Sequence, residues 1–356
     1  MPDNKINKKD IKKILVFRTD RIGDVLLSIP AIRALYQSFQ HPSISVITQS
    51  SYACLLEGNP EIDRIISYDK KNDGFEQTLR LIKNLKKEEF NLAVVLNPKK
   101  RSNIIAFLAG IPYRLGYQQK WGFLLNYRIK DEKYKGEKHE VDYNLDLVRT
   151  IGADTNDKSF SIKTNQEEDT VDFLLKNSKI KDNDSLIAIH PGSSCHSKRW
   201  PIERFAQVGR KLAITGGEKI VIVGDKQEEE LGKTMEKLMQ IPVLNLTAKL
   251  SLKQLAALFK RCSLLISTDS GPVHIAAAVG LRCVVIFGRN LAGLSPRRWG
   301  PRLKNSVVLH NPPNCYPCLA HNCQNNLECL QRITVEDVLK AVEKTFYVKG
   351  KVIKEQ

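Results

Sequence analysis

Short apolar runs alternate with longer helical patterns along the whole chain. The runs cover residues 13–17, 43–47, 92–96, 186–190, 219–223, 263–267 and 283–287. Helical spacing of apolar side chains follows over residues 24–39, 203–214 and 227–239. Because the runs are continuously apolar rather than alternating, they predict parallel strands in sheets that are covered on both faces.

This alternation stops near residue 160 and then restarts, which predicts two doubly wound, Rossmann-like α/β domains in series. The chain of 356 residues is long enough for both. Polar, turn-rich segments at 151–159 and 176–185 place the boundary between them. We expect an N-terminal domain over 1–165, a C-terminal domain over 166–332, and a final segment over 333–356 that contains a helix.

Composition narrows the kind of protein and its partners. Hydrophobic residues make up 42% and charged residues 27%, as in a soluble globular protein, and no run approaches the length of a membrane span. The basic N-terminus lacks the apolar region of a signal peptide, so we expect a cytoplasmic protein. With 56 Lys+Arg against 39 Asp+Glu, the formal charge of +17 favours acidic partners.

Among acidic partners, nucleic acid is disfavoured. Aromatic residues are sparse at 7%, and no long basic run is present, whereas single-strand binders interleave aromatic and basic groups. An anionic membrane surface or a phosphorylated substrate therefore fits the charge better.

Ligands of doubly wound sheets bind at the carboxyl ends of the strands, so the loops there are informative. After 186–190 comes PGSSCHSKRWP, whose small residues and Lys198 suit a diphosphate, although it matches neither the P-loop nor the GxGxxG pattern. A loop with a solvated Lys-Arg pair is the alternative.

Two further loops follow strands of the second domain. In TDSGPVHIAAA, Asp269 or Ser270 caps a helix whose free amides suit phosphate, and His274 either reaches the same ligand or packs in the core. In GDKQEEE, the carboxylates favour a helix dipole, or one of them accepts a hydrogen bond from a ribose hydroxyl.

Asp24 stands in RTDRIGDVL, directly after the apolar run 13–17. One interpretation is a helix cap, which contributes about 0.5–2 kcal/mol. The other is a general base, which contributes roughly a hundredfold to ten-thousandfold in rate. The residues alone leave both open.

Four of the eight cysteines crowd near the C-terminus in the pattern C-x2-C-x4-C-x5-C. In a cytoplasmic protein this crowding favours a structural zinc site over disulfides or free thiols. The four candidate ligands are Cys315, Cys318, Cys323 and Cys329.

Together these motifs resemble one family. RTDRIGDVLLSIPAIRAL, GIPYRLGY, HPGSSCHSKRWPIERFAQV, STDSGPVHIAAAVG and CYPCLAHNCQNNLECLQRITVEDV are similar, in order and over nearly the whole chain, to segments of the family 9 glycosyltransferases. These enzymes are the ADP-heptose:lipopolysaccharide heptosyltransferases.

The resemblance implies a fold and a reaction. The fold is GT-B, with two Rossmann-like domains facing each other across a cleft and a C-terminal helix that crosses back to the first domain. The reaction moves heptose from ADP-heptose to the inner core of lipopolysaccharide, on Kdo-lipid A or heptosyl-Kdo-lipid A. It inverts the anomeric carbon, needs no metal and uses no cofactor beyond the donor.

It also implies residue roles. Asp24 is the catalytic base, and Lys198 stabilises the departing ADP. The residues that hold the donor are Ser193, Ser194, Lys198, Asp269, Ser270, Gly271 and His274, with Asp225 or Glu228 at the adenosine. As acceptor-binding residues we expect Lys99, Lys100 and Arg101, which follow a strand of the first domain. The positive charge then predicts peripheral contact with the anionic inner face of the cytoplasmic membrane.

Two alternatives remain. A family 9 enzyme can use another nucleotide sugar or a non-lipopolysaccharide acceptor. From a different class, the chain is a basic, non-catalytic binder of membrane or nucleic acid. A base opposite a diphosphate site argues against the second alternative, since a binder has no use for it.

Overall fold

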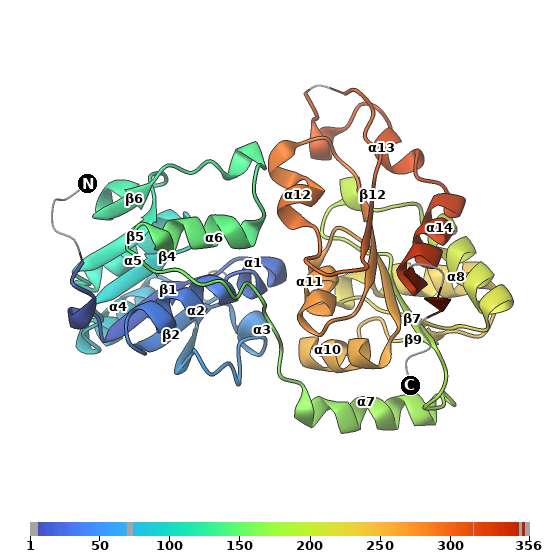
Figure 1. The fold of residues 1–356 in the computed structure, drawn as a ribbon, viewed down its shortest axis with the longest axis horizontal. Coiled ribbons are helices and arrows are strands. Elements are labelled where there is room, and N and C mark those ends of the chain that lie inside the picture. The colour runs from blue at the N-terminus through green and yellow to red at the C-terminus, as the bar shows by residue number, and fades with distance from the viewer. Residues whose placement is uncertain (1–5, 70–73, 316, 349–350, 353–356) are drawn as a thin grey trace. The chain divides into compact units, whose positions relative to one another are not determined.

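The computed structural model describes residues 6–69, 74–315, 317–348 and 351–352. They form two compact units, Met1–Lys163 and Thr164–Gln356, each built around a parallel six-stranded sheet (Figure 1). The two doubly wound domains predicted from the alternating pattern are therefore confirmed, and the division falls within two residues of the predicted one. Within the described part of the chain, no helix is both long and apolar enough to cross a bilayer.

The first sheet has the strand order β3-β2-β1-β4-β5-β6. Its strands are β1 (Lys13–Phe17), β2 (Ser43–Thr48), β3 (Arg64–Ser67), β4 (Leu92–Val95), β5 (Tyr113–Tyr117) and β6 (Tyr127–Ile129). Its helices are α1 (Ile22–Leu26), α2 (Ile29–Ser38), α3 (Ser50–Ala53), α4 (Phe75–Lys87), α5 (Lys100–Leu108) and α6 (Glu140–Arg149). Leu15 and Phe17 share a core with α4 and α5, while their neighbours Ile14 and Val16 are equally buried on the opposite face. This two-sided burial explains the continuous apolar runs.

The prediction of a single helix over residues 24–39 is wrong, because the structure has two helices in this region. The first helical segment, α1, ends at Leu26, and α2 begins at Ile29. Pro30 lies in the first turn of α2, where its missing amide is not needed, and its ring would clash with the carbonyl of residue 26 in a continuous helix. The break leaves α1 as a short element that follows β1 directly.

The second sheet has the order β12-β11-β10-β7-β8-β9. Its strands are β7 (Leu186–His190), β8 (Lys219–Ile222), β9 (Leu244–Asn245), β10 (Leu264–Thr268), β11 (Cys283–Phe287) and β12 (Val307–His310). Its helices are α7 (Asn165–Asn177), α8 (Ile202–Gly216), α9 (Glu229–Met239), α10 (Leu252–Arg261), α11 (Gly271–Ala278), α12 (Pro296–Trp299), α13 (Glu328–Gln331) and α14 (Val335–Phe346). A short hairpin of β13 (Tyr347–Val348) and β14 (Lys351–Val352) follows.

The C-terminal helix α14 belongs to the core of the second unit. It lies beside α8 (Figure 1) and also contacts β11 and β12, and its residues Val338, Ala341 and Val342 are buried in the same cluster as the strands. We predicted that this unit ends at residue 332 and that a separate helical segment, which crosses back to the first domain, follows it. Its apolar face is instead used within the second unit, which therefore continues through α14.

Candidate active site

A buried arginine organises the carboxyl edge of the first sheet. Arg18 follows β1, is 1% exposed, and donates to the backbone oxygens of Asp24 (Nε, 2.9 Å) and Leu96 (Nη1, 3.0 Å). Its Nη2 lies 3.1 Å from both Asp24 Oδ1 and Glu140 Oε1, and its Nη1 lies 3.4 Å from Asp20 Oδ2. The guanidinium of Arg18 thus pairs with three carboxylates. This network was not predicted from the sequence, because Glu140 is far from Arg18 along the chain.

A second buried cation completes this network. Lys133 Nζ lies 2.7 Å from Glu140 Oε1 and 4.7 Å from the ring centroid of Tyr117. Asn144, one turn along α6 from Glu140, donates to the backbone oxygen of Leu27 (3.0 Å). These contacts tie α6 to the turn that follows α1, so the position of Asp24 is set by elements far apart in the sequence.

Asp24 itself lies in the first turn of α1, where it serves as a cap and is also prepared for chemistry. Its Oδ2 accepts from the backbone amide of Arg21 at 3.4 Å, which is a weak capping contact. Burial raises the pKa of Asp24, and the negative charges of Asp20 and Glu140 add to this effect against the opposing effect of Arg18. The side chain is still 19% exposed, so a substrate can reach it. A reachable carboxylate with a raised pKa suits a general base.

The three predicted acceptor residues point to different partners. Lys99 Nζ is bound to Asp20 Oδ1 (2.6 Å) and to the backbone oxygen of Thr19 (2.9 Å), at the same sheet edge as Arg18. Lys100 lies over the ring of Trp121, and the guanidinium of Arg101 stacks on Tyr68. Lys99 is therefore the acceptor candidate that lies beside the Asp24 network.

In the second unit, the loops after β7 and β10 meet. Lys198 Nζ lies 2.5 Å from Asp269 Oδ2 and 3.3 Å from the backbone oxygen of Asp269. Thr268 Oγ1 donates to the backbone oxygen of Gly192 (2.8 Å), which joins the two loops. Ser194 is exposed, whereas Ser193 is buried. The structure thus brings together the two segments that the sequence assigned to a diphosphate.

Buried polar contacts hold the start of α11. Ser270 Oγ lies 3.1 Å from His190 Nδ1 and 3.0 Å from Ser267 Oγ. Gly271 is the first residue of α11, and His274 is buried one turn further on, with its ring 6.3 Å from that of Trp299. Ser270 and Gly271 therefore lie at the rim of the site, and His274 lies deeper in the unit.

The two carboxylates after β8 differ in their surroundings. Asp225 is exposed, and its Oδ1 accepts from the amide of Gln227 (2.8 Å) as a cap. Glu228 is 8% exposed, and its Oε2 accepts from the amide of Asp225 (3.0 Å) and lies 3.0 Å from His190 Nε2. Although burial opposes ionisation, the hydrogen bond with His190 lowers the pKa of Glu228. Glu228 is thus held by His190 and by the amide of Asp225, and it packs against Gly192. Of the two carboxylates, Asp225 is the one that a ligand can reach more easily.

This arrangement makes a prediction for Gly192. A Cβ atom at this position would lie 1.9 Å from Glu228 Oε1. Gly192→Ala should therefore force the loop or Glu228 away from its partners and lower the free energy of unfolding by about 1–3 kcal/mol. Thermal unfolding with and without ADP would measure this loss. Gly74→Ala is the control, because its Cβ meets open space. Equal unfolding temperatures of both variants would contradict the proposed close contact.

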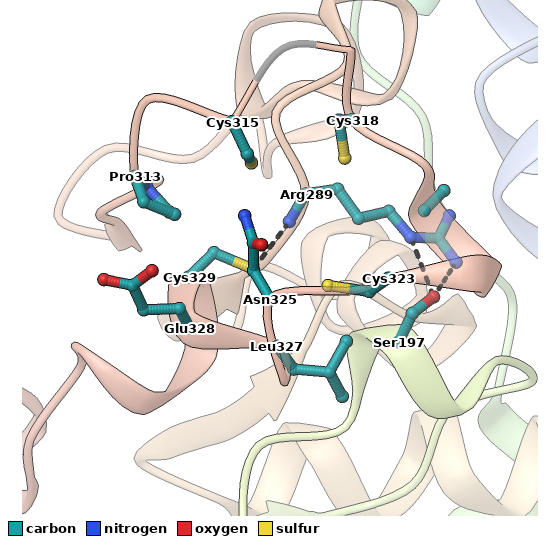
Figure 2. Close-up of a pocket in the computed structure, with 11 residues that line it drawn as sticks. Ser197, Arg289, Pro313, Cys315, Cys318, Cys323, Asn325, Leu327, Glu328 and Cys329 are labelled. Carbon is teal, nitrogen blue, oxygen red and sulfur yellow. Dashed lines mark hydrogen bonds between the residues drawn. The ribbon is translucent and has the colours of Figure 1, made fainter.

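Arg289 is a functional candidate that was not among the predicted site residues. It follows β11, is 6% exposed, and its guanidinium donates to Ser197 Oγ through Nη2 (2.7 Å) and Nε (3.2 Å). Figure 2 shows this side chain reaching Ser197 across a small pocket. Arg289 thereby positions the residue directly before Lys198.

The C-terminal cysteines line the same pocket (Figure 2). The backbone amides of Arg289 and Asn290 donate to the sulfurs of Cys329 (3.3 Å) and Cys318 (3.4 Å), and burial raises the pKa of Cys329. Across the described ranges, no three His, Cys, Asp or Glu side chains are arranged to hold a metal ion. The four cysteines thus line one pocket, and zinc stays a prediction, which the metal content of the purified protein would test.

Comparison with known proteins identifies relatives of the whole chain. The model of glycosyltransferase family 9 (heptosyltransferase) matches residues 78–328. Lipooligosaccharide heptosyltransferase 2 of Campylobacter jejuni is 26% identical over 342 residues, which cover 93% of this chain and 98% of the relative.

Solved structures show the same likeness. The crystal structure of a family 9 glycosyltransferase from Veillonella parvula superposes with a TM-score of 0.83 at 25% identity, covering 94% of this chain and 97% of that one. The structure of the Escherichia coli ADP-heptose lipopolysaccharide heptosyltransferase II gives a TM-score of 0.75 at 22% identity, covering 94% and 98%. The predicted GT-B fold class is confirmed.

Proposed function

Because this chain belongs to glycosyltransferase family 9, we propose that it transfers heptose from ADP-heptose to the lipid-linked inner core of lipopolysaccharide. The acceptor in this proposal is Kdo-lipid A or heptosyl-Kdo-lipid A. Two of the relatives that match nearly the whole chain carry heptosyltransferase names, which supports the donor and the acceptor class. The observation that carries the proposal is the ion pair between Lys198 and Asp269 beside the start of α11. The first unit of the same chain holds Asp24, a carboxylate with a raised pKa.

We propose a single displacement that inverts the anomeric carbon. Asp24 takes the proton from the attacking acceptor hydroxyl, which is too weak a nucleophile to displace a diphosphate unaided. Lys198 stabilises the negative charge that grows on ADP as the glycosidic bond breaks. The amides at the start of α11, with Ser270 and Ser194, hold the phosphates. In this scheme the positive charge of Lys198, rather than a metal ion, stabilises the departing diphosphate.

The ends of the donor and the acceptor complete the assignment. We assign the ribose hydroxyl of the donor to Asp225, because this carboxylate is exposed, and a supporting role to Glu228, which is buried against His190. Lys99 is the side chain that we assign to the acidic sugars of the acceptor, because it lies beside Asp20 and the Asp24 network. The acceptor is anchored in a membrane, so we propose that the protein works at the anionic inner face of the cytoplasmic membrane as a peripheral protein.

Release of ADP would test the proposal directly. Purified protein is given ADP-heptose in the presence of a chelator, with inner-core acceptors truncated before the first or before the second heptose. We expect ADP release with one acceptor, which would identify the step and show that transfer does not depend on a metal. Donor binding without release on either acceptor would favour another acceptor. A protein that does not bind ADP-heptose would favour another nucleotide sugar.

A further inference from the structure

The loop that follows β5 is held in a strained conformation. Lys120 and Trp121 have φ angles of 48° and 68°, in the left-handed region that side chains other than glycine rarely adopt. Gly122 cannot be replaced freely, because a Cβ there would lie 2.6 Å from the backbone oxygen of Tyr117. The buried side chain of Asn103 donates to the backbone oxygen of Lys120 (3.1 Å) and fixes the loop to α5. The chain therefore maintains this geometry at an energetic cost.

The strained loop presents large apolar side chains to solvent. Trp121 is 47% exposed and Phe123 is 68% exposed, and their ring centroids lie 5.9 Å apart. At the end of α5, which contacts the loop, Phe107 and Leu108 are 46% and 49% exposed. We call these four residues the aromatic patch. An exposed apolar cluster on a pinned loop indicates a surface that binds something.

Positive charges accompany the patch. Lys100 Nζ lies 5.7 Å from the ring centroid of Trp121, and Lys120 is exposed beside it. The guanidinium of Arg114 lies 5.4 Å from the ring of Phe107 and donates to the backbone oxygen of Leu124 (2.8 Å), next to Phe123. The whole segment 90–130 contains lysine and arginine but no aspartate or glutamate. The occupant of this surface must therefore be both apolar and negatively charged.

We propose that the aromatic patch inserts into the interface of an anionic lipid bilayer. Tryptophan and phenylalanine favour the boundary between headgroups and acyl chains, and lysine and arginine bind the anionic headgroups around them. Trp121 and Phe123 belong to the loop that follows β5, whereas Phe107 and Leu108 precede this strand. The carboxyl end of β5 lies on the same edge of the first sheet as those of β1 and β4, from which Asp24 and Lys99 follow. The inference rests on the proposed function, in which membrane contact brings Asp24 to the level of a lipid-linked acceptor.

Vesicle binding by the full-length protein tests the inference without any sugar transfer. We expect the protein to sediment with vesicles of phosphatidylcholine containing phosphatidylglycerol, and to bind pure phosphatidylcholine vesicles more weakly. Trp121→Ala combined with Phe123→Ala should weaken binding at least about tenfold. The matched control is Phe75→Ala combined with Phe173→Ala, which removes side chains that are 80% and 68% exposed on other helices. This control should bind as the wild type does.

Several outcomes would overturn the inference. Unchanged vesicle binding by the Trp121/Phe123 variant would do so, as would an equal loss in the control. A wild-type protein that binds a single-stranded oligonucleotide but no vesicles would favour nucleic acid, and a dimer lost in the variant would assign the patch to a second copy of the chain. Quenching of Trp121 fluorescence by brominated lipids gives a second readout in folded protein.

Transfer to a delipidated acceptor separates this inference from the proposed function. The Trp121/Phe123 variant should retain transfer to such a soluble acceptor while it loses vesicle binding. Wild-type protein that transfers heptose but binds no vesicles would refute the membrane contact alone. Wild-type protein that binds vesicles but transfers no heptose would refute the proposed reaction alone.

Discussion

Replacing Asp24 by asparagine should lower kcat by about a hundredfold to ten-thousandfold while leaving the affinity for ADP-heptose unchanged. Asparagine keeps the size of the side chain, and its single oxygen can still accept a hydrogen bond from Arg18. Only the weak 3.4 Å contact with the amide of Arg21 is lost, so the local structure should persist. It cannot accept a proton at neutral pH. Single-turnover rates and donor titrations would separate these two effects.

The pH dependence gives an independent check. Because burial and neighbouring carboxylates raise the pKa of Asp24, kcat/KM should fall as the pH is lowered through this raised value, at a higher pH than an exposed aspartate would give. The Asp24→Asn variant should lack this acidic limb. Because its pKa is raised by folding, the folded protein binds the proton of Asp24 more tightly than the unfolded chain does. This stabilises the fold at low pH, and the stabilisation is lost as the pH rises through the raised pKa. A neutral asparagine should therefore not lower the unfolding temperature at neutral pH.

Asp20 provides the matched control for this prediction. It also lies beside Arg18, but although burial opposes its ionisation, Arg18 and Lys99 lower the pKa of Asp20. An ionised, fully paired carboxylate is a poor proton acceptor, so Asp20→Asn should reduce the rate far less than Asp24→Asn. Equal losses in both variants would assign Asp24 to the charge network rather than to proton transfer. Unchanged turnover in Asp24→Asn would reduce it to a helix cap.

The strands were predictable because each is a continuous apolar run between polar segments. Residues 13–17 and 186–190 form β1 and β7 with the expected ends, since burial on both faces demands apolar side chains at every position. The loops that follow them were identified by their position at the sheet edge. The break before α2 was also readable in principle, because Pro30 stands inside the apolar helical pattern.

Long-range partners were not predictable from the sequence. Arg18 lies directly after a strand, but nothing in its neighbourhood indicates that Glu140 would pair with it across 122 positions. Glu228 stood among three glutamates that were equivalent in sequence, and its contact with His190 depends on the packing of β8 beside β7. Such pairings arise from tertiary packing, which local patterns of charge and hydrophobicity do not encode. The charge of Glu140 also adds to the effect of burial in raising the pKa of Asp24.

Replacing Lys198 by alanine should have the second large effect. If its ammonium group stabilises the charge that develops on the departing ADP, Lys198→Ala should lower kcat by about a hundredfold to a thousandfold, more than it weakens binding of ADP-heptose. Lys198 is partly exposed and is held 2.5 Å from Asp269, so its removal leaves a carboxylate at the phosphate site. Repulsion between that carboxylate and the diphosphate should add to the loss.

Two companion variants separate these contributions. Lys226→Ala removes an exposed lysine of the same unit that pairs with Glu229, and it should leave the kinetics unchanged. Lys198→Ala combined with Asp269→Asn removes both partners and should bind the donor more tightly than Lys198→Ala alone, without recovering kcat. Recovery of kcat in this double variant would show that Lys198 serves only to neutralise Asp269. A continued loss would assign its charge to the transition state, since the repulsion would then be absent and the rate still low.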